Sequence, residues 1–469
     1  MTTPPNPNNH EGEATSRPHT TTGTPLESPI NNTELHDPNK LTPAGRRALF
    51  AAVLGTVIEW YDYALYGAAA GVVIGPLFFK DFTTGQQLAT FATFAVGFVA
   101  RPLGGLIIGH IGDAYGRRPA MMASILMMGL ATVAIGLLPT AAAVGILAPI
   151  LLVLLRLIQG LGAGAELAGA MTLVAEFAPP AKRGLLTSAV LSMPPLGIVI
   201  ATGAFLAVSS LGDATLLGWA WRVPFLISAV LFALAVFIRR RLEETPEYVE
   251  AMAKRMEAEK QRVPVVELWR KHARSVITAF MAVTGHNCLN YAMAVFAIGF
   301  MVSPAVGLDR SSALAAVTIG TLFGVVATPV GGVLADRFGS GKILATGCFV
   351  GAIYAFPFMK ALASGSAVTA GIAIAFGYGV VIAMTSGAQG SYLAGLFPAA
   401  ERFSGIALAR EANGAVVAGF TPLMLTAILR ATDGSIYAAA TAIAICLILS
   451  LIAIAIGTRS YAATDVRAR

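Results

Sequence analysis

Long apolar runs alternate with short polar connections along most of the chain after residue 46. Each run has about 20 residues or more, enough for an α-helix to cross about 30 Å of hydrocarbon. A membrane β-barrel would instead show segments of about ten residues with strict apolar and polar alternation, and no such segments are seen. The pattern predicts an all-α membrane protein with twelve transmembrane helices, near residues 48–78, 88–112, 119–138, 145–177, 186–208, 220–240, 274–303, 312–335, 342–362, 366–396, 403–428 and 435–458.

The predicted helices form two sets of six that resemble each other weakly. A charged stretch, Arg239–Arg274, separates the sets. Asp113 corresponds to Asp336, and Arg183 corresponds to Arg402. The two members of each pair are separated by nearly the same number of residues. Such internal symmetry is typical of alternating-access transporters. We therefore predict two pseudo-symmetric six-helix bundles at 46–240 and 274–460, a cytoplasmic loop at 241–273, a disordered cytoplasmic tail at 1–45 and a cytoplasmic tail at 461–469.

The charge composition fits membrane insertion and predicts an orientation. Only 12% of the 469 residues are charged and 56% are hydrophobic, whereas soluble domains carry about 25% charge. The formal net charge of +7 comes mostly from Lys and Arg in loops on one side, which indicates topology rather than nucleic-acid binding. We expect a plasma-membrane protein with both termini in the cytoplasm. Cys288, Cys348 and Cys446 lie in apolar segments and are expected to pack as small residues, not to form disulfides or a metal site.

Two carboxylates, Glu59 and Asp62, interrupt the first apolar run. They are three positions apart and share one face of a helix. A carboxylate near the bilayer centre is costly unless it is compensated, which makes it a candidate for function. Mutual repulsion and desolvation both favour binding a proton. The pair is therefore predicted to couple transport to protons and to titrate as a unit, with Asp62 the deeper member. The alternative is a structural acid pair held by Arg101.

Three arginines, Arg101, Arg156 and Arg410, lie at similar depth within apolar runs. A guanidinium binds a carboxylate in bidentate geometry, so each is a candidate for binding an anionic substrate. For Arg101 and Arg156 the alternative is a counter-charge to the membrane carboxylates. The neighbouring acid of Arg410 is Glu411, and consecutive residues on a helix do not face each other. Arg410 therefore has no obvious acid on its own helix face and is a plausible anchor for an anionic substrate.

A polar cluster on the predicted seventh helix contains His286, Asn287, Asn290 and Tyr291. These side chains are predicted to hydrogen-bond a substrate, and the alternative is hydrogen bonding between packed helices. Gln389 on the predicted tenth helix is a weaker candidate of the same kind.

Several motifs resemble the major facilitator superfamily. Gly109-x-x-Gly112-Asp113-x-x-Gly116-Arg117-Arg118 is similar to the superfamily's signature between the second and third helices. Within the superfamily the chain resembles the metabolite:proton symporter family, from about residue 46 to 458, through Glu59-Trp60-Tyr61-Asp62-Tyr63-x-x-Tyr66-Gly67, Gly97-Phe98-x-x-Arg101-Pro102-x-Gly104-Gly105, Arg156-x-x-Gln159-Gly160 with Glu166, and Trp221-Arg222-x-Pro224-Phe225.

The resemblance implies the major facilitator fold and further candidate residues. It implies a third proton-coupling carboxylate, Glu166. It also implies a cytoplasmic gate made by Asp113, Gly116, Arg117 and Arg118, together with Asp336 and Arg337 from the second repeat. The second signature departs from the family because Gly339-Ser340-Gly341-Lys342 lacks the usual pair of basic residues.

The resulting hypothesis is secondary active uptake by proton symport. The predicted partners are protons, the lipid bilayer and a small polar organic solute, most favourably a dicarboxylate or a shikimate-like hydroxy acid. A zwitterion such as proline or betaine, a transporter-like receptor and a membrane enzyme are the alternatives. No nucleotide, nucleic-acid or metal motif is found, so no cofactor is expected. The protein is not expected to be an enzyme, and it is expected to be a monomer.

Overall fold

The computed structural model is built from α-helices and short π-helical turns, with no strand among the residues it describes. These residues all belong to one compact unit, Asn39–Arg469. Residues 43–243 are called the first half below, and residues 265–467 the second half. The structure describes residues 43–80, 82, 85–115, 117–164, 170–171, 174–175, 178–179, 182–243, 265–398 and 401–467.

The first half contains α1 (Pro43–Val72), α2 (Ile74–Phe78), α3 (Gln86–Tyr115), α4 (Arg117–Leu137), α5 (Ala141–Val144), α6 (Leu147–Gly162), α8 (Arg183–Leu191), α9 (Met193–Ser209), α10 (Asp213–Thr215), the π turn η2 (Leu216–Ala220) and α11 (Arg222–Glu243). The second half contains α13 (Val265–Tyr291), η3 (Ala292–Phe296), α14 (Ala297–Val302), α15 (Arg310–Phe338), α16 (Ser340–Leu362), α17 (Ala367–Phe376), η4 (Gly377–Ile382), α18 (Ala383–Gly395), α19 (Arg402–Asn413), η5 (Gly414–Ala418), α20 (Thr421–Ala431) and α21 (Ile436–Arg467).

Apolar helices occupy all twelve predicted positions. Within the described part of the chain, nine helices are long and apolar enough to cross a membrane. A tenth position holds a pair bent by 48°, Asp213–Ala220 with Arg222–Leu234. Met122–Leu137 and Leu147–Gly162, which are shorter, occupy the third and fourth positions. The prediction of an all-α membrane fold is confirmed.

Two helix boundaries differ from the prediction. The seventh helix begins at Val265, where a cytoplasmic loop was expected, and it is kinked at His272 (φ −131°, ψ 26°). The last helix continues to Arg467, into the expected tail. Hydropathy marks only the part of a helix that lies in lipid, whereas backbone hydrogen bonding continues the helix through polar residues such as Lys271. The expected tail at residues 1–45 lies almost entirely outside the described residues.

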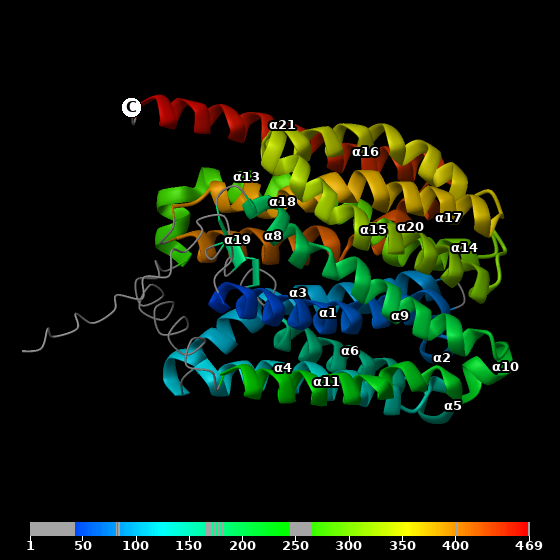
Figure 1. The fold of residues 1–469 in the computed structure, drawn as a ribbon. Helices are drawn as coiled ribbons and strands as arrows, with labels where there is room; N and C mark the ends of the chain where they lie inside the picture. The colour runs from blue at the N-terminus through cyan, green and yellow to red at the C-terminus, as the bar shows by residue number, and fades with distance from the viewer. Residues whose placement is uncertain are drawn as a thin grey trace, which may run out of the picture. The chain divides into compact units, whose positions relative to one another are not determined.

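The interface between the halves is formed by α1, α3, α8 and α9 on one side. They contact η3, α14, α15, α18, α19, η5 and α20 on the other. Figure 1 shows α1, α3 and α9 lying between α4, α6 and α11 on one side and the helices of the second half on the other. The α1 and α3 residues Glu59 and Arg101 lie where the two halves meet.

Close packing of α3 against α6 depends on small residues. Gly160 of α6 lies directly against the Gly97 carbonyl of α3. Gly97 in turn faces the guanidinium of Arg156, which leaves no room there for a side chain. Membrane helices use such small residues because they allow the backbones to approach. This approach places the α6 residues Arg156 and Gln159 beside the charged face of α1.

Gly160→Ala is expected to destabilise the protein, because its methyl group would collide with the Gly97 carbonyl. Overpacking of this kind costs about 1–3 kcal/mol. The melting temperature of the purified protein in detergent should fall. Gly218→Ala is the matched control, since no other heavy atom lies within 4 Å of the added carbon. Equal melting temperatures for both variants would show that the α3–α6 contact is less tight than described.

Candidate functional site

A buried ion cluster joins the halves around Arg101 of α3. Its Nε donates to Glu411 Oε2 at 2.9 Å, and its Nη2 donates to Glu59 Oε1 at 3.0 Å. Glu59 lies on α1 in the first half, whereas Glu411 lies on α19 in the second. Arg101 is 7% exposed and Glu59 1%. One guanidinium therefore pairs with carboxylates from both halves at a depth where an unpaired charge would be costly.

Aromatic rings enclose this cluster. The Arg101 guanidinium carbon lies 4.8 Å from the centre of the Tyr63 ring and 5.7 Å from that of Phe98. Tyr291 packs edge-on against Phe98, with ring centres 5.2 Å apart. A cation over aromatic faces is stabilised by their quadrupoles. Tyr291, predicted to bind substrate, thus packs in the aromatic wall and does not line the cavity described below.

Asp62 belongs to a separate network. It is fully buried, and its Oδ2 accepts a hydrogen bond from Gln159 Nε2 at 2.6 Å. The same amide nitrogen donates to Thr132 Oγ1 at 2.8 Å. No hydrogen-bond donor among the described residues reaches Asp62 Oδ1. Glu59 and Asp62, although they share a helix face, therefore have different partners.

Arg156 is linked to Asp62 by hydrogen bonds that run through Gln159, and its positive charge also acts on the Asp62 carboxylate. Its Nη1 donates to Gln159 Oε1, and its Nη2 donates to the Phe94 carbonyl at 3.1 Å. The guanidinium carbon lies 3.9 Å from the centre of the Tyr66 ring. Arg156 is fully buried and does not line the central cavity. The substrate-binding role of Arg156 and its alternative, a counter-charge to the membrane carboxylates, both stay predictions.

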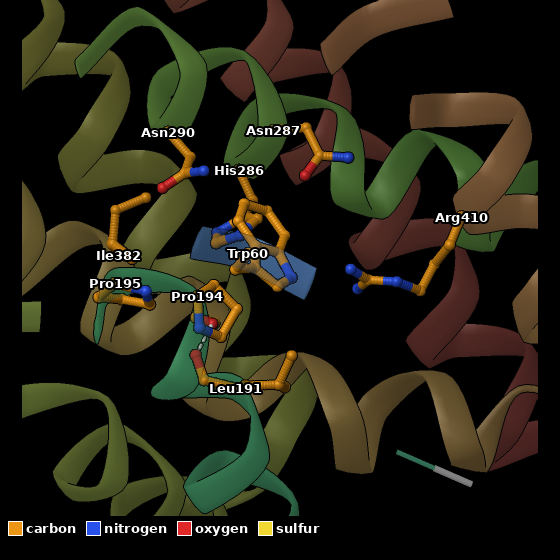
Figure 2. A pocket seen from close by; sticks show the side chains of 10 residues that line it. Trp60, Leu191, Pro194, Pro195, His286, Asn287, Asn290, Ile382 and Arg410 are labelled. Carbon is orange, nitrogen blue, oxygen red and sulfur yellow. Dashed lines mark hydrogen bonds between the residues drawn. The ribbon is translucent and has the colours of Figure 1, made fainter. Parts of the chain in front are cut away.

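A cavity lies between the two halves next to the ion cluster (Figure 2). Its lining comes from α1, α8 and α9 and from α13, η4, α18 and α19: Trp60, Leu191, Pro194, Pro195, His286, Asn287, Asn290, Ile382, Ser386 and Arg410. Figure 2 shows the Arg410 guanidinium extending toward Trp60, with the polar residues of α13 on one side and Leu191 and the two prolines on the other. The open space is about that of one water molecule. A solute can fit only if the walls move apart.

Three polar cavity residues of α13 are held by neighbouring helices. His286 Nδ1 lies 2.9 Å from the hydroxyl oxygen of Thr385. Asn287 Nδ2 donates to Asn413 Oδ1 at 2.6 Å. The Tyr378 hydroxyl donates to Asn290 Oδ1 at 3.0 Å. These contacts satisfy part of the hydrogen-bonding capacity and fix the orientation of the side chains toward the cavity.

The Arg410 charge has a neutral partner. Its Nη1 donates to Gln389 Oε1. No described carboxylate is within salt-bridge distance of its guanidinium, although Glu411 is the next residue. Gln389 is fully buried and its Nε2 has no hydrogen-bond partner among the described residues. A guanidinium in a cavity beside an amide is suited to bind a carboxylate.

Contacts between the halves also occur at both ends. The Asp336 carboxylate at the end of α15 accepts hydrogen bonds from the amides of Gly184 (2.7 Å) and Leu185 (2.9 Å) in the first turn of α8. At the opposite end, Arg310 of α15 donates to the Val72 carbonyl at 3.0 Å and pairs with Asp213. A carboxylate at a helix N-terminus satisfies otherwise unpaired amides.

The structure thus brings four predicted residues together in the cavity: His286, Asn287, Asn290 and Arg410. Trp60 and Ser386 also line it, and they were not among the candidates. Trp60 could have been noticed between Glu59 and Asp62 in a family motif, whereas Ser386 has no distinguishing signal in the sequence. Arg337, a predicted gate residue, is in the last turn of α15, with its guanidinium carbon 5.3 Å from the centre of the Phe338 ring.

Several predicted positions cannot be assigned contacts. Glu166 and Gly116 lie outside the described residues. Asp113 is on α3, and Arg117 and Arg118 are on α4, but their side chains are not described. Their roles stay predictions. Across the described residues, no group of three or more His, Cys, Asp or Glu side chains could hold a metal ion.

Three relatives found by comparison with known proteins are transport proteins by name. The inner membrane metabolite transport protein YhjE of Escherichia coli K12 is 37% identical over 402 residues, covering 83% of this chain and 90% of that protein. The shikimate transporter of the same organism is 35% identical, and the match covers 87% of this chain and 94% of that protein. The proline/betaine transporter of Escherichia coli K12 is 33% identical, and the match covers 81% of this chain and 77% of that protein. These relatives are transporters rather than enzymes, and the narrower resemblance to metabolite symporters agrees with their names.

Solved structures support the same architecture. The crystal structure of a D-xylose-proton symporter superposes with a TM-score of 0.67, covering 86% of this chain and 97% of that chain, at 18% sequence identity. At that identity the likeness shows the fold alone. A model of the Major Facilitator Superfamily matches residues 52–422. The chain is a membrane-embedded, multi-pass transporter that belongs to the major facilitator superfamily.

Proposed function

We propose that this protein takes up a small polar solute bearing a carboxylate, together with protons, by alternating access. The observation that carries the proposal is the Arg410 guanidinium in a cavity between the halves, hydrogen-bonded to the neutral Gln389. A bound carboxylate would supply the opposite charge and two acceptor oxygens. His286, Asn287 and Asn290 would hydrogen-bond the hydroxyl or second carboxyl groups of a hydroxy acid or dicarboxylate.

Asp62 supports proton coupling. It is fully buried, its hydrogen bond comes from a neutral amide, and one of its oxygens has no donor among the described residues. A protonated carboxyl group is easier to bury in such surroundings than a carboxylate. A proton bound there from the outside would reduce the cost of closing the cavity.

The contacts at both ends support alternating access. Asp336 ties α15 to the first turn of α8, and Arg310 ties the other end of α15 to Asp213 and the end of α1. Each set of contacts can break while the other holds. Breaking them in turn would expose the central cavity first to one face of the membrane and then to the other.

A zwitterionic solute is the second candidate, and Trp60 is the observation that favours it. Its ring lines the cavity opposite Arg410 (Figure 2). An aromatic face attracts a quaternary ammonium group. A betaine could therefore place its carboxylate on Arg410 and its ammonium on Trp60.

Uptake into proteoliposomes tests the function. We expect an inward proton gradient to drive accumulation of at least one labelled solute among shikimate, a dicarboxylate, proline and betaine. Accumulation of none of them would contradict the proposal. Solute-dependent stabilisation without uptake would instead favour the transporter-like receptor.

Asp62→Asn should abolish gradient-driven accumulation, because an amide cannot carry the proton. Counterflow exchange of the same solute should persist, since exchange needs no net proton movement. Asp433→Asn is the matched control: Asp433 lies in an exposed turn with φ 49°, a conformation that Asn adopts readily. Undiminished accumulation by Asp62→Asn would remove Asp62 from the mechanism.

Arg410→Lys should weaken solute binding by roughly tenfold or more, because an ammonium keeps the charge but loses the bidentate geometry. The measurement is the solute concentration for half-maximal counterflow. Arg430→Lys, at the exposed end of α20, is the control and should leave that concentration unchanged. Equal values for both variants would exclude Arg410 as the anion anchor.

A further inference from the structure

Among the ion pairs that the described residues form between the halves, Arg101–Glu411 is the buried one. Its atoms lie 2.9 Å apart, and the side chains are 9% and 13% exposed. The ion pair between Arg310 and Asp213 also joins the halves, but the Asp213 side chain is 64% exposed. An exposed pair contributes little to stability. Of these two ion pairs, the central one therefore costs more free energy to break when the halves separate.

Breaking this pair affects its two members differently. Arg101 would keep Glu59, because α1 and α3 belong to the same half. Glu411 would lose its guanidinium partner. At 13% exposure, the Glu411 side chain is more accessible than that of Glu59, at 1%. The contact is thus able to open and close repeatedly without leaving an arginine unpaired in the membrane.

The solute anchor lies next to this pair in the chain. Arg410 precedes Glu411 on α19 and lines the cavity. The charged and titratable groups around Glu411 are Arg101, Arg410 and Glu59, with Tyr63 and Tyr291 also near the cluster. The two arginines balance the two carboxylates.

A carboxylate bound to Arg410 would add a negative charge beside Glu411. At low dielectric, like charges at close range repel strongly. Solute binding would therefore weaken the hold of Arg101 on Glu411, both by repulsion and by competition for the guanidinium groups. The effect of the solute on the Arg101–Glu411 pair would thus pass from Arg410 to Glu411, which are consecutive residues of α19.

We propose that Glu411 is a coupling residue: its ion pair with Arg101 holds the halves together until an anionic solute binds Arg410, and so prevents a proton from crossing without solute. This inference rests on the proposed proton symport. It assigns Glu411 a positioning role, because the residue acts through Arg101 and not on the solute itself.

Glu411→Gln removes the charge and keeps the size of the side chain. In proteoliposomes without solute, this variant should dissipate an imposed pH gradient roughly tenfold faster than the wild type, a typical size for a coupling between sites. An entrapped pH-sensitive dye measures the rate. The leak should disappear in the double variant Asp62→Asn/Glu411→Gln, because Asp62 would carry the proton. A merely destabilised protein would not show this rescue.

Glu401→Gln is the matched control. Glu401 lies just before α19 and pairs with His272 of α13 at 2.5 Å, so this carboxylate contact lies within the second half. Removing its charge should leave the dissipation rate at the wild-type value.

Hydrogen exchange at the amides of Gly184 and Leu185 gives a second measurement. These amides are in the first turn of α8, where no intrahelical carbonyl accepts them, and they donate to Asp336 of the other half. Their exchange therefore reports separation of the halves. In the absence of solute, these two amides should exchange faster in Glu411→Gln than in the wild type. In Glu401→Gln they should exchange at the wild-type rate.

Each outcome of these experiments tests a different part of the proposal. A variant Glu411→Gln with wild-type leak and exchange, in a protein that accumulates solute, overturns the role of Glu411 alone. A leak that persists in the double variant contradicts the proposed route, because Glu411 would then not control proton movement through Asp62. A wild type that accumulates no solute overturns the proposed symport and this inference with it.

Discussion

Charge buried in the membrane must be compensated, and the sharing of Arg101 between Glu59 and Glu411 is how this protein does so at its centre. The rest of the interior follows from that requirement. Aromatic rings surround the guanidinium, while Asp62 is compensated separately through Gln159. Because one partner of Arg101 comes from the other half, the same interaction that makes the charges tolerable also ties the halves together.

The fold could be predicted from hydropathy because a backbone in lipid must satisfy its own hydrogen bonds, which leaves helices as the spanning element. The twelve positions were therefore found, although helix ends outside the lipid, such as Val265 and Arg467, were not. The polar cavity residues were also predictable, since His286 and Arg410 stand out in apolar runs. Apolar lining residues such as Leu191 and Ile382 were not, because a sequence does not distinguish them from residues that face lipid.

Contacts between distant helices were the least predictable part. In the sequence, Glu411 was considered only as the neighbour of Arg410. Its ion-pair partner in the structure is Arg101, which lies 310 positions away. Depth along a helix can be counted from the sequence, whereas rotation about the helix axis relative to other helices cannot. Glu59 and Asp62 illustrate this limit: they share a face, yet neighbouring helices supply them with different partners.

The π turns of the second half add a property that a uniform α-helix would lack. Three cavity helices contain one near mid-span: η3 after Tyr291, η4 containing Tyr378 and η5 after Asn413. A π turn holds one residue more than an α turn. Converting one into the other would rotate the following residues by about 100° relative to those before it. The second half can therefore present a different set of side chains to a bound solute by changing helical register, with its backbone hydrogen bonds largely kept.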